Sequence, residues 1–135
     1  MPSRTFLDTN VLVYAVDNAD PAKKQTARAL LTETADVVMS AQVLGEFYVT
    51  ITRKLQPAVA LHTATEMVRL LARLACVPID SQLVQLAIDA GQRWQLSLWD
   101  ALVVEAARQA GCTRVLTEDL SAGAVYQGLT IENPF

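Results

Sequence analysis

The chain has 135 residues, of which 14 are acidic and 11 are Lys or Arg, giving a formal net charge of -3. This length suits one domain that buries roughly two thirds of its unfolded surface, so we expect a single domain over residues 1–135. The hydrophobic fraction of 52% is high, but the sequence has no run of about 18 apolar residues, which excludes a transmembrane helix.

The amino terminus predicts a cytoplasmic location. Met1-Pro2-Ser3-Arg4 leads directly into an apolar strand pattern, without the long apolar core and small-residue cleavage site of a signal peptide. The cysteines, Cys76 and Cys112, lie in apolar contexts without a Cys-x-x-Cys or Cys/His cluster. We therefore expect inert packing thiols and neither a zinc site nor a disulfide.

The first half of the chain alternates between strand and helix patterns. Residues 5–7 predict a buried strand that ends at Asp8, and an apolar stretch follows over residues 11–16. Asp20 and Pro21 are typical of a helix start and predict a helix through Glu33. The remaining elements predicted for this half are a strand at 37–39, a helix at 41–54 capped by Ser40, and a helix whose start is marked by a capping box from Thr63 to Glu66.

The second half continues the alternation. Residues 76–79 predict a strand in which Pro78 favours an edge position. The elements that follow are a helix capped by Asp80, a helix at 98–110 that ends before Gly111, a strand at 114–117 and a short strand at 129–131. This order predicts an α/β fold with right-handed crossovers and a central, mostly parallel sheet of four to five strands.

Acidic side chains stand at four ends or starts of these elements. Asp8 and Asp119 follow strands, Glu46 lies in the second turn of a helix that itself follows a strand, and Asp100 lies in the first turn of another helix. In open parallel sheets, ligands bind beyond the carboxyl ends of the strands, so these acids are expected at one edge of the sheet.

Gathered carboxylates need compensation. Two like charges about 4 Å apart repel by roughly 4 kcal/mol at an effective dielectric constant of 20. Mg²⁺ or Mn²⁺ would remove this conflict, because hard cations prefer carboxylate oxygens and water. Three of the four acids also have a structural interpretation: Asp8 as a turn residue, Glu46 as a solvent-facing residue, and Asp100 as a helix-start residue that the helix dipole favours.

Four segments in order carry a resemblance to a known family. They are Phe6-Leu7-Asp8-Thr9-Asn10-Val11-Leu12, Leu44-Gly45-Glu46-Phe47-Tyr48, Leu98-Trp99-Asp100-Ala101-Leu102-Val103 and Leu116-Thr117-Glu118-Asp119-Leu120. With them, the chain resembles the PIN-domain family of metal-dependent ribonucleases along its whole length. Within that family it looks most like the virulence-associated protein C toxins of type II toxin-antitoxin systems.

The resemblance implies a PIN-like three-layer α/β/α fold and a site made of named residues. The catalytic and metal-binding acids of the family fall on Asp8, Glu46, Asp100 and Asp119, and its supporting positions fall on Asn10, Thr117 and Thr9. Glu118 neighbours Asp119, but adjacent residues of an extended segment point to opposite sides, so only one of them should enter the site. The family pattern selects Asp119. The resemblance also implies an RNA substrate, a cognate antitoxin and a homodimer.

The implied reaction is hydrolysis of an RNA phosphodiester by a water that Mg²⁺ activates. The chain has one histidine, His62, so a mechanism with paired histidines is excluded. We expect Asp8 and Asp100 to ligate the principal metal, Glu46 and Asp119 to orient water or assist a second ion, and Asn10 and Thr117 to fix the ligands by hydrogen bonds.

Two other functions remain open at this point. A haloacid-dehalogenase-like phosphatase also places an Asp after a strand, but a second Asp normally stands two residues later, where this chain has Asn10. A PIN-like module that binds RNA or protein without cutting is the other alternative. The target RNA, the cleavage sequence and the number of metal ions cannot be read from the sequence. Candidate phosphate contacts, each of which also reads as a solvated helix residue, are Lys23, Lys24, Arg28, Arg53 and Lys54.

Overall fold

The computed structural model describes residues 3–135, so Met1 and Pro2, on which part of the prediction about the amino terminus rests, lie outside the described residues. The strands are β1 (Arg4–Leu7), β2 (Val37–Ser40), β3 (Ala75–Val77), β4 (Cys112–Leu116), β5 (Val125–Tyr126) and β6 (Leu129–Glu132). The helices are α1 (Thr9–Tyr14), α2 (Pro21–Glu33), α3 (Ala41–Arg53), α4 (Leu61–Leu71), α5 (Ser81–Trp94) and α6 (Leu98–Gln109). None of the helices within residues 3–135 has the length and apolar character needed to cross a membrane.

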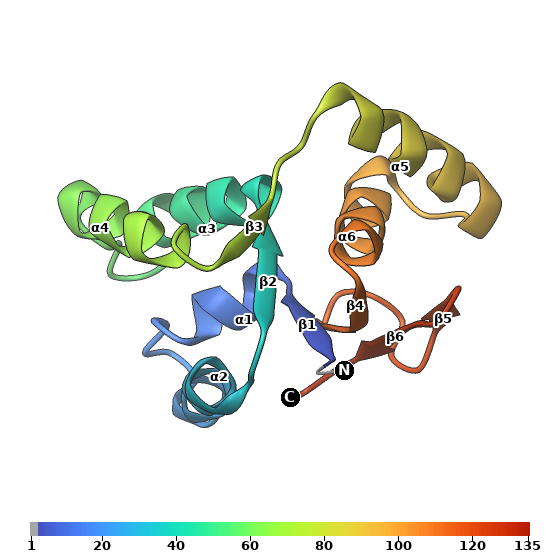
Figure 1. Ribbon diagram of the computed structural model, residues 1–135. Helices are drawn as coiled ribbons and strands as arrows, with labels where there is room; N and C mark the ends of the chain where they lie inside the picture. The colour runs from blue at the N-terminus through green and yellow to red at the C-terminus, as the bar shows by residue number, and fades with distance from the viewer. Residues whose placement is uncertain (1–2) are drawn as a thin grey trace.

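The strands form one sheet in the order β3-β2-β1-β4-β6-β5, between two layers of helices (Figure 1). All neighbouring strands are parallel except β5, which pairs antiparallel with β6. Helices α1 to α4 lie on one side of the sheet, and α5 and α6 lie on the other. This confirms the predicted α/β architecture, with β5 as one more strand than the four to five expected.

The start of α4 differs from the prediction. The helix begins at Leu61, and its N-cap, Ala60, has no side chain that could accept a hydrogen bond. Thr65 Oγ1 instead donates to the Leu61 carbonyl at 2.9 Å, which places this residue in the helix interior. The predicted capping box from Thr63 to Glu66 is therefore wrong: the N-cap lies three residues earlier, at Ala60, and the helix begins with the largely exposed Leu61.

The sheet reverses its strand order between β1 and β4. Leu7 lies opposite Leu116 in parallel register, and the Asp8 amide donates to the Leu116 carbonyl at 3.1 Å. The residues that follow the two strands, Asp8 and Thr117, therefore emerge side by side at the carboxyl ends. This is the place where open α/β sheets bind ligands.

Helix α6 is the most deeply buried helix on its side of the sheet, with Ala101 to Ala107 all buried. Helix α5 approaches it closely at Gly91. A Cβ atom there would lie 3.0 Å from the Leu96 carbonyl oxygen and 3.6 Å from Ala101 Cβ. The Leu96 amide also donates to the Gly91 carbonyl at 3.0 Å, so the turn that leads into α6 is held against the end of α5.

The cysteines behave as packing thiols, as predicted. Within residues 3–135 both are free, Cys112 is buried and Cys76 is half-buried. Burial raises the pKa of the Cys112 thiol to about 11, so it stays protonated and unreactive at neutral pH.

Candidate metal centre

Asp8 is the buried centre of the candidate site, with 7% of its surface exposed. It follows β1 and caps α1: the Thr9 amide donates to Oδ1 and the Thr117 hydroxyl donates to Oδ2, both at 2.8 Å. The pKa of Asp8 is raised to about 6, mainly by burial and to a smaller extent by the negative charges of Glu46 and Asp119. The hydrogen bonds from Thr9 and Thr117 act in the opposite direction. The hydrogen bonds thus fix the position of the carboxylate, but they do not fully offset the cost of burying its negative charge.

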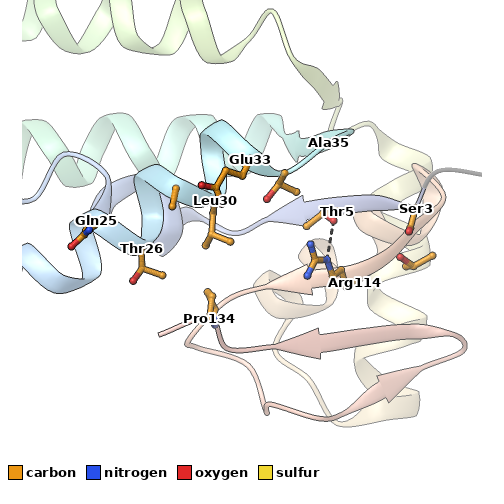
Figure 2. A pocket seen from close by; sticks show the side chains of 12 residues that line it. Ser3, Thr5, Gln25, Thr26, Leu30, Glu33, Ala35, Arg114 and Pro134 are labelled. Carbon is orange, nitrogen blue, oxygen red and sulfur yellow. Dashed lines mark hydrogen bonds between the residues drawn. The ribbon is translucent and has the colours of Figure 1, made fainter.

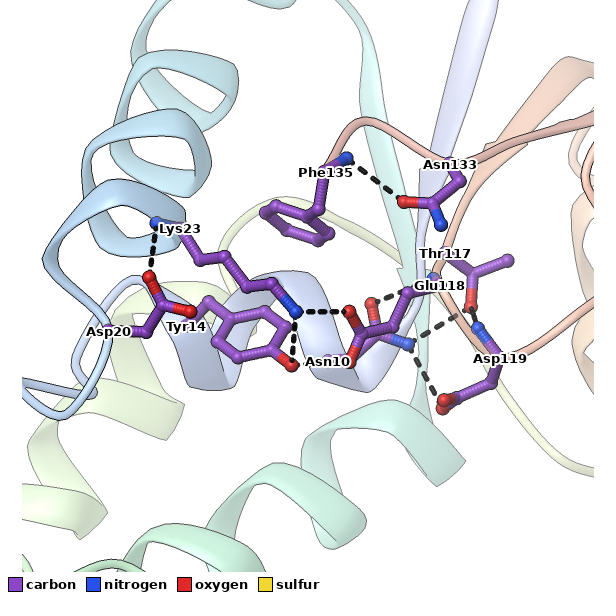
Figure 3. Close-up of polar contacts among 9 residues, drawn as sticks. All are labelled: Asn10, Tyr14, Asp20, Lys23, Thr117, Glu118, Asp119, Asn133 and Phe135. Carbon is purple, nitrogen blue, oxygen red and sulfur yellow. Dashed lines mark hydrogen bonds and ion pairs between the residues drawn. The ribbon is translucent and has the colours of Figure 1, made fainter.

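Asn10 joins the first turn of α1 to the loop after β4 (Figure 3). Its Nδ2 donates to Thr117 Oγ1 and to Asp119 Oδ2, each at 3.0 Å, and its Oδ1 accepts from the Glu118 amide at 3.3 Å. The Asp119 amide donates in turn to Thr117 Oγ1 at 3.0 Å. Asp8, Asn10, Thr117 and Asp119 therefore form one connected hydrogen-bond network across two strand ends.

Glu46 reaches the same place from α3. Thr9 Oγ1 donates to its Oε2 at 2.9 Å, and Gln42 Nε2 donates to its Oε1 at 2.8 Å. Gln42 precedes Glu46 by one helical turn, so the two side chains share a helix face. Thr9, the weakest of the supporting candidates by sequence, is the residue that links Glu46 to the Asp8 turn.

Asp100 is near this network but does not join it. It lies in the first turn of α6, where its amide donates to the Ser97 cap at 3.1 Å. Its neighbour Trp99 offers a carbonyl that accepts from Gln42 Nε2 at 3.3 Å. Within residues 3–135, no hydrogen bond connects the Asp100 carboxylate to Asp8, Glu46 or Asp119.

The candidate donor atoms are of the type that a hard divalent cation prefers, but they are not grouped closely enough to bind one as they stand. Among residues 3–135, no three Asp, Glu, His or Cys side chains are spaced as they stand to hold a metal ion. All the candidate donors are oxygens, and a cation would relieve the charge that raises the pKa of Asp8. Gln42 Oε1 is buried without a partner in the described part of the chain. The assignment of Asp8, Glu46, Asp100 and Asp119 as ligands stays a prediction.

Glu118 points away from Asp119, as expected, although the two residues lie in a bend after β4 and not in an extended segment. Lys23 Nζ donates to Glu118 Oε2 at 3.0 Å and to the Tyr14 hydroxyl at 3.3 Å, and that hydroxyl donates to Glu118 Oε1 (Figure 3). The Tyr14 ring packs edge-on against Phe135, with 4.9 Å between centroids. This second cluster, made of Tyr14, Lys23, Glu118 and Phe135, holds the outer side of the loop that carries Asp119.

The sequence reasoning missed Gln42 and Tyr14 as parts of this region. The signal for Gln42 was its position one turn before Glu46. The contact of Tyr14 with Glu118 spans 104 residues, and no local pattern indicates it. His62 lies on α4 as an exposed residue and takes no part in either cluster.

A hollow of about 740 Å³ lies at the opposite ends of the strands (Figure 2). Ser3 and Thr5 of the β1 end and Thr113 and Arg114 of the β4 end line it. Arg114 is already engaged there: Nε donates to Thr5 Oγ1 and Nη1 pairs with Glu132, both at 3.0 Å. This hollow is separate from the acidic cluster and gathers none of its residues.

A family model described as the PIN domain matches residues 5–126. The chain belongs to the PIN-domain family. The match includes both strand ends and all four candidate acids. It confirms the family that the four sequence segments indicated.

Solved structures share the fold of this PIN domain. Mycobacterium tuberculosis VapC20, described as a sarcin-ricin loop cleaving toxin, is 21% identical with a TM-score of 0.65, over 82% of this chain and 86% of that chain. A toxin-antitoxin complex from Klebsiella pneumoniae is 17% identical with a TM-score of 0.71, over 97% and 98% of the two chains. DNA-bound VapBC from Salmonella typhimurium is 18% identical with a TM-score of 0.67, over 98% and 99%. No curated protein matches the chain in sequence.

Proposed function

We propose that this PIN domain is a Mg²⁺-dependent endoribonuclease, the toxin of a type II toxin-antitoxin pair. The observation that carries the proposal is the buried Asp8 carboxylate. It lies at the switch point of the sheet, where burial, with a smaller contribution from the negative charges of Glu46 and Asp119, raises its pKa to about 6. Such an arrangement favours a bound cation over a proton once the pH exceeds that value.

The roles of the residues follow from their positions. Asp8 and Asp100 would hold the principal metal, and Glu46 and Asp119 would orient the attacking water or assist a second ion. Asn10, Thr117 and Thr9 fix these carboxylates by the hydrogen bonds described above. When bound, Mg²⁺, or Mn²⁺ in its place, would supply an activated water and neutralise charge on the phosphate.

The toxin assignment is supported by similar structures that are toxins or toxin-antitoxin complexes. It includes a cognate antitoxin, a homodimer and a cytoplasmic location. For RNA phosphates, Arg53 and Lys54 are exposed at the end of α3. Lys23 pairs with Glu118, Lys24 Nζ donates to Asn18, and Arg28 Nε donates to the Ala15 carbonyl at 2.8 Å, so these three are partly occupied within the chain.

The test is cleavage of a structured RNA by the purified protein with Mg²⁺ and with EDTA. We expect cleavage that stops with EDTA, is lost in Asp8→Asn and Asp100→Asn, and persists in Asp89→Asn, a control on the exposed face of α5. Binding without cleavage in Mg²⁺ or Mn²⁺ would instead support the inactive binding module. Membership in the PIN family leaves the haloacid-dehalogenase alternative without support, and trapping of an aspartyl-phosphate on Asp8 would reverse that conclusion.

A further inference from the structure

One aromatic side chain stands apart from all the others. The chain has two tryptophans, three tyrosines and three phenylalanines. Phe6 and Phe47 are buried, and five more pack against the core: Tyr14, Tyr48, Trp94, Tyr126 and Phe135. Trp99 is 64% exposed and, within residues 3–135, is the aromatic residue that does not pack against the core.

The backbone that presents Trp99 is firmly held beside the acidic cluster. Ser97 caps α6, and the Trp99 carbonyl accepts from Gln42 Nε2 at 3.3 Å. The same Nε2 donates to Glu46 at 2.8 Å, so a single side-chain amide links Trp99 to a candidate metal ligand. The next residue, Asp100, is another. The backbone of Trp99 therefore lies at the rim of the site, on the capped first turn of a helix, and its indole is exposed to solvent.

Electrostatic attraction alone would bind a nucleic acid only weakly at this site. The formal net charge is -3, and Lys23, beside the Asp119 loop, is paired with Glu118. Stacking of a base on an aromatic ring does not depend on net charge, and one such contact strengthens binding roughly 5- to 150-fold. Among the side chains at the rim of the site, the Trp99 indole is the best suited to base stacking.

We propose that Trp99 stacks on an unpaired base of the RNA substrate next to the bond that is cut. The inference rests on the proposed ribonuclease function and adds a binding residue to it: Trp99 contacts the RNA where the strand is unpaired. In a duplex, both faces of each base are covered by neighbouring bases, so Trp99 would have no face to contact.

The experiment follows indole fluorescence in EDTA, where binding is separated from cleavage. The titrants are an unstructured RNA oligonucleotide, its duplex, and the same single strand with abasic sites. In Trp94→Phe, which keeps Trp99 as its only tryptophan, we expect saturable quenching by the base-containing single strand alone. Trp99→Phe, which keeps Trp94, should show no such quenching. This second variant keeps the test decisive if loss of Trp94 disturbs folding.

Affinity and activity complete the test. We expect Trp99→Ala to bind the single strand at least fivefold more weakly, and Trp99→Phe to recover part of the loss. Equal quenching by the duplex, or by the abasic strand, would overturn the inference. So would a Trp99 signal that depends on protein concentration without RNA, because Trp99 would then lie in a contact between copies. Specific quenching without Mg²⁺-dependent cleavage would refute the proposed nuclease while retaining the stacking site.

Discussion

Asn10 Nδ2 lies 3.0 Å from Asp119 Oδ2, although the two residues are 109 positions apart in the sequence. The same nitrogen donates to Thr117, whose hydroxyl donates to Asp8. A neutral amide at position 10 thus holds two carboxylates in place without adding a third negative charge. The arrangement makes the position of Asp119 depend on Asn10.

Replacing Asn10 with Ala should therefore weaken both the fold and the site. The variant loses the contacts to Thr117, Asp119 and the Glu118 amide, and we expect about 1–3 kcal/mol lower free energy of unfolding. Urea unfolding measures this, and the Mg²⁺-dependent cleavage rate should also fall. Asn18→Ala is the matched control, since Asn18 is an exposed residue whose side chain contacts Lys24. Equal stability of the two variants would show that the Asn10 network contributes nothing.

The raised pKa of Asp8 predicts a pH-dependent loss of stability in the absence of metal. Below about pH 4, Asp8 is protonated in the folded and the unfolded chain, so it imposes no penalty. Between its ordinary pKa of 3.8 and the folded value of about 6, only the unfolded chain releases the proton, so stability falls as the pH rises. The full loss is roughly 3 kcal/mol.

The measurement compares wild type with Asp8→Asn in urea and EDTA at several pH values. The Asn variant lacks this titration but loses the acceptor of the Thr117 hydroxyl, which costs about 1 kcal/mol. We expect it to be the less stable protein near about pH 4 and the more stable one near about pH 8. Added Mg²⁺ should stabilise wild type alone. Parallel curves over this range would contradict the raised pKa.

Gln42→Met tests the bridge between α3 and α6. The change removes the donor to Glu46 and Trp99 and also the buried Oε1 that has no partner, so the net change in stability should stay below about 1 kcal/mol. The cleavage rate should fall about tenfold or more, because a residue that orients the metal ligands is lost. Gln85→Met, at an exposed position of α5, is the control and should cleave normally. A large loss of stability in Gln42→Met would indicate a structural role instead.

Tyr14→Phe isolates the hydroxyl in the second cluster, because the ring can still pack against Phe135. Burial acts to raise the pKa of Glu118, but the hydrogen bonds from Tyr14 and Lys23 outweigh it and hold that pKa below its ordinary value. The stabilisation from Glu118 is therefore present above its ordinary pKa of 4.5 and is lost as the pH falls through the lower folded value. We expect the variant to be about 1 kcal/mol less stable near neutral pH, with a smaller deficit in acid. Urea unfolding at the two pH values checks this, and a constant deficit would argue against the contact with Glu118.

The helix starts that the sequence predicted well are determined by a few neighbouring residues. Asp20 accepts from the Lys23 amide at 3.0 Å and Asp80 from the Leu83 amide at 2.9 Å, so each helix start is determined within its own first turn. The start of α4 lacks such a cap, and β5 has two residues paired only with β6. The start of α4 thus has no capping side chain that a local pattern could indicate, and the limits of β5 depend on its pairing with β6.

The same difference between local and long-range determinants applies to the candidate site. Asp8 and Asp119 could be placed together from sequence, because parallel strands bring their carboxyl ends to one edge. The bridge from Gln42 to Trp99 requires the first turns of α3 and α6, which lie on opposite sides of the sheet, to meet across 57 residues. The place of Asp100 was equally out of reach, since it depends on where tertiary packing seats the first turn of α6.

A residue without a side chain, Gly91, sets where that first turn sits. An added methyl group would meet the Leu96 carbonyl at 3.0 Å, pushing the connection between α5 and α6 outward together with the indole and the acid that follow it. A genetic screen for loss of the proposed toxin activity should therefore recover changes at Gly91, a position that would touch neither ion nor RNA.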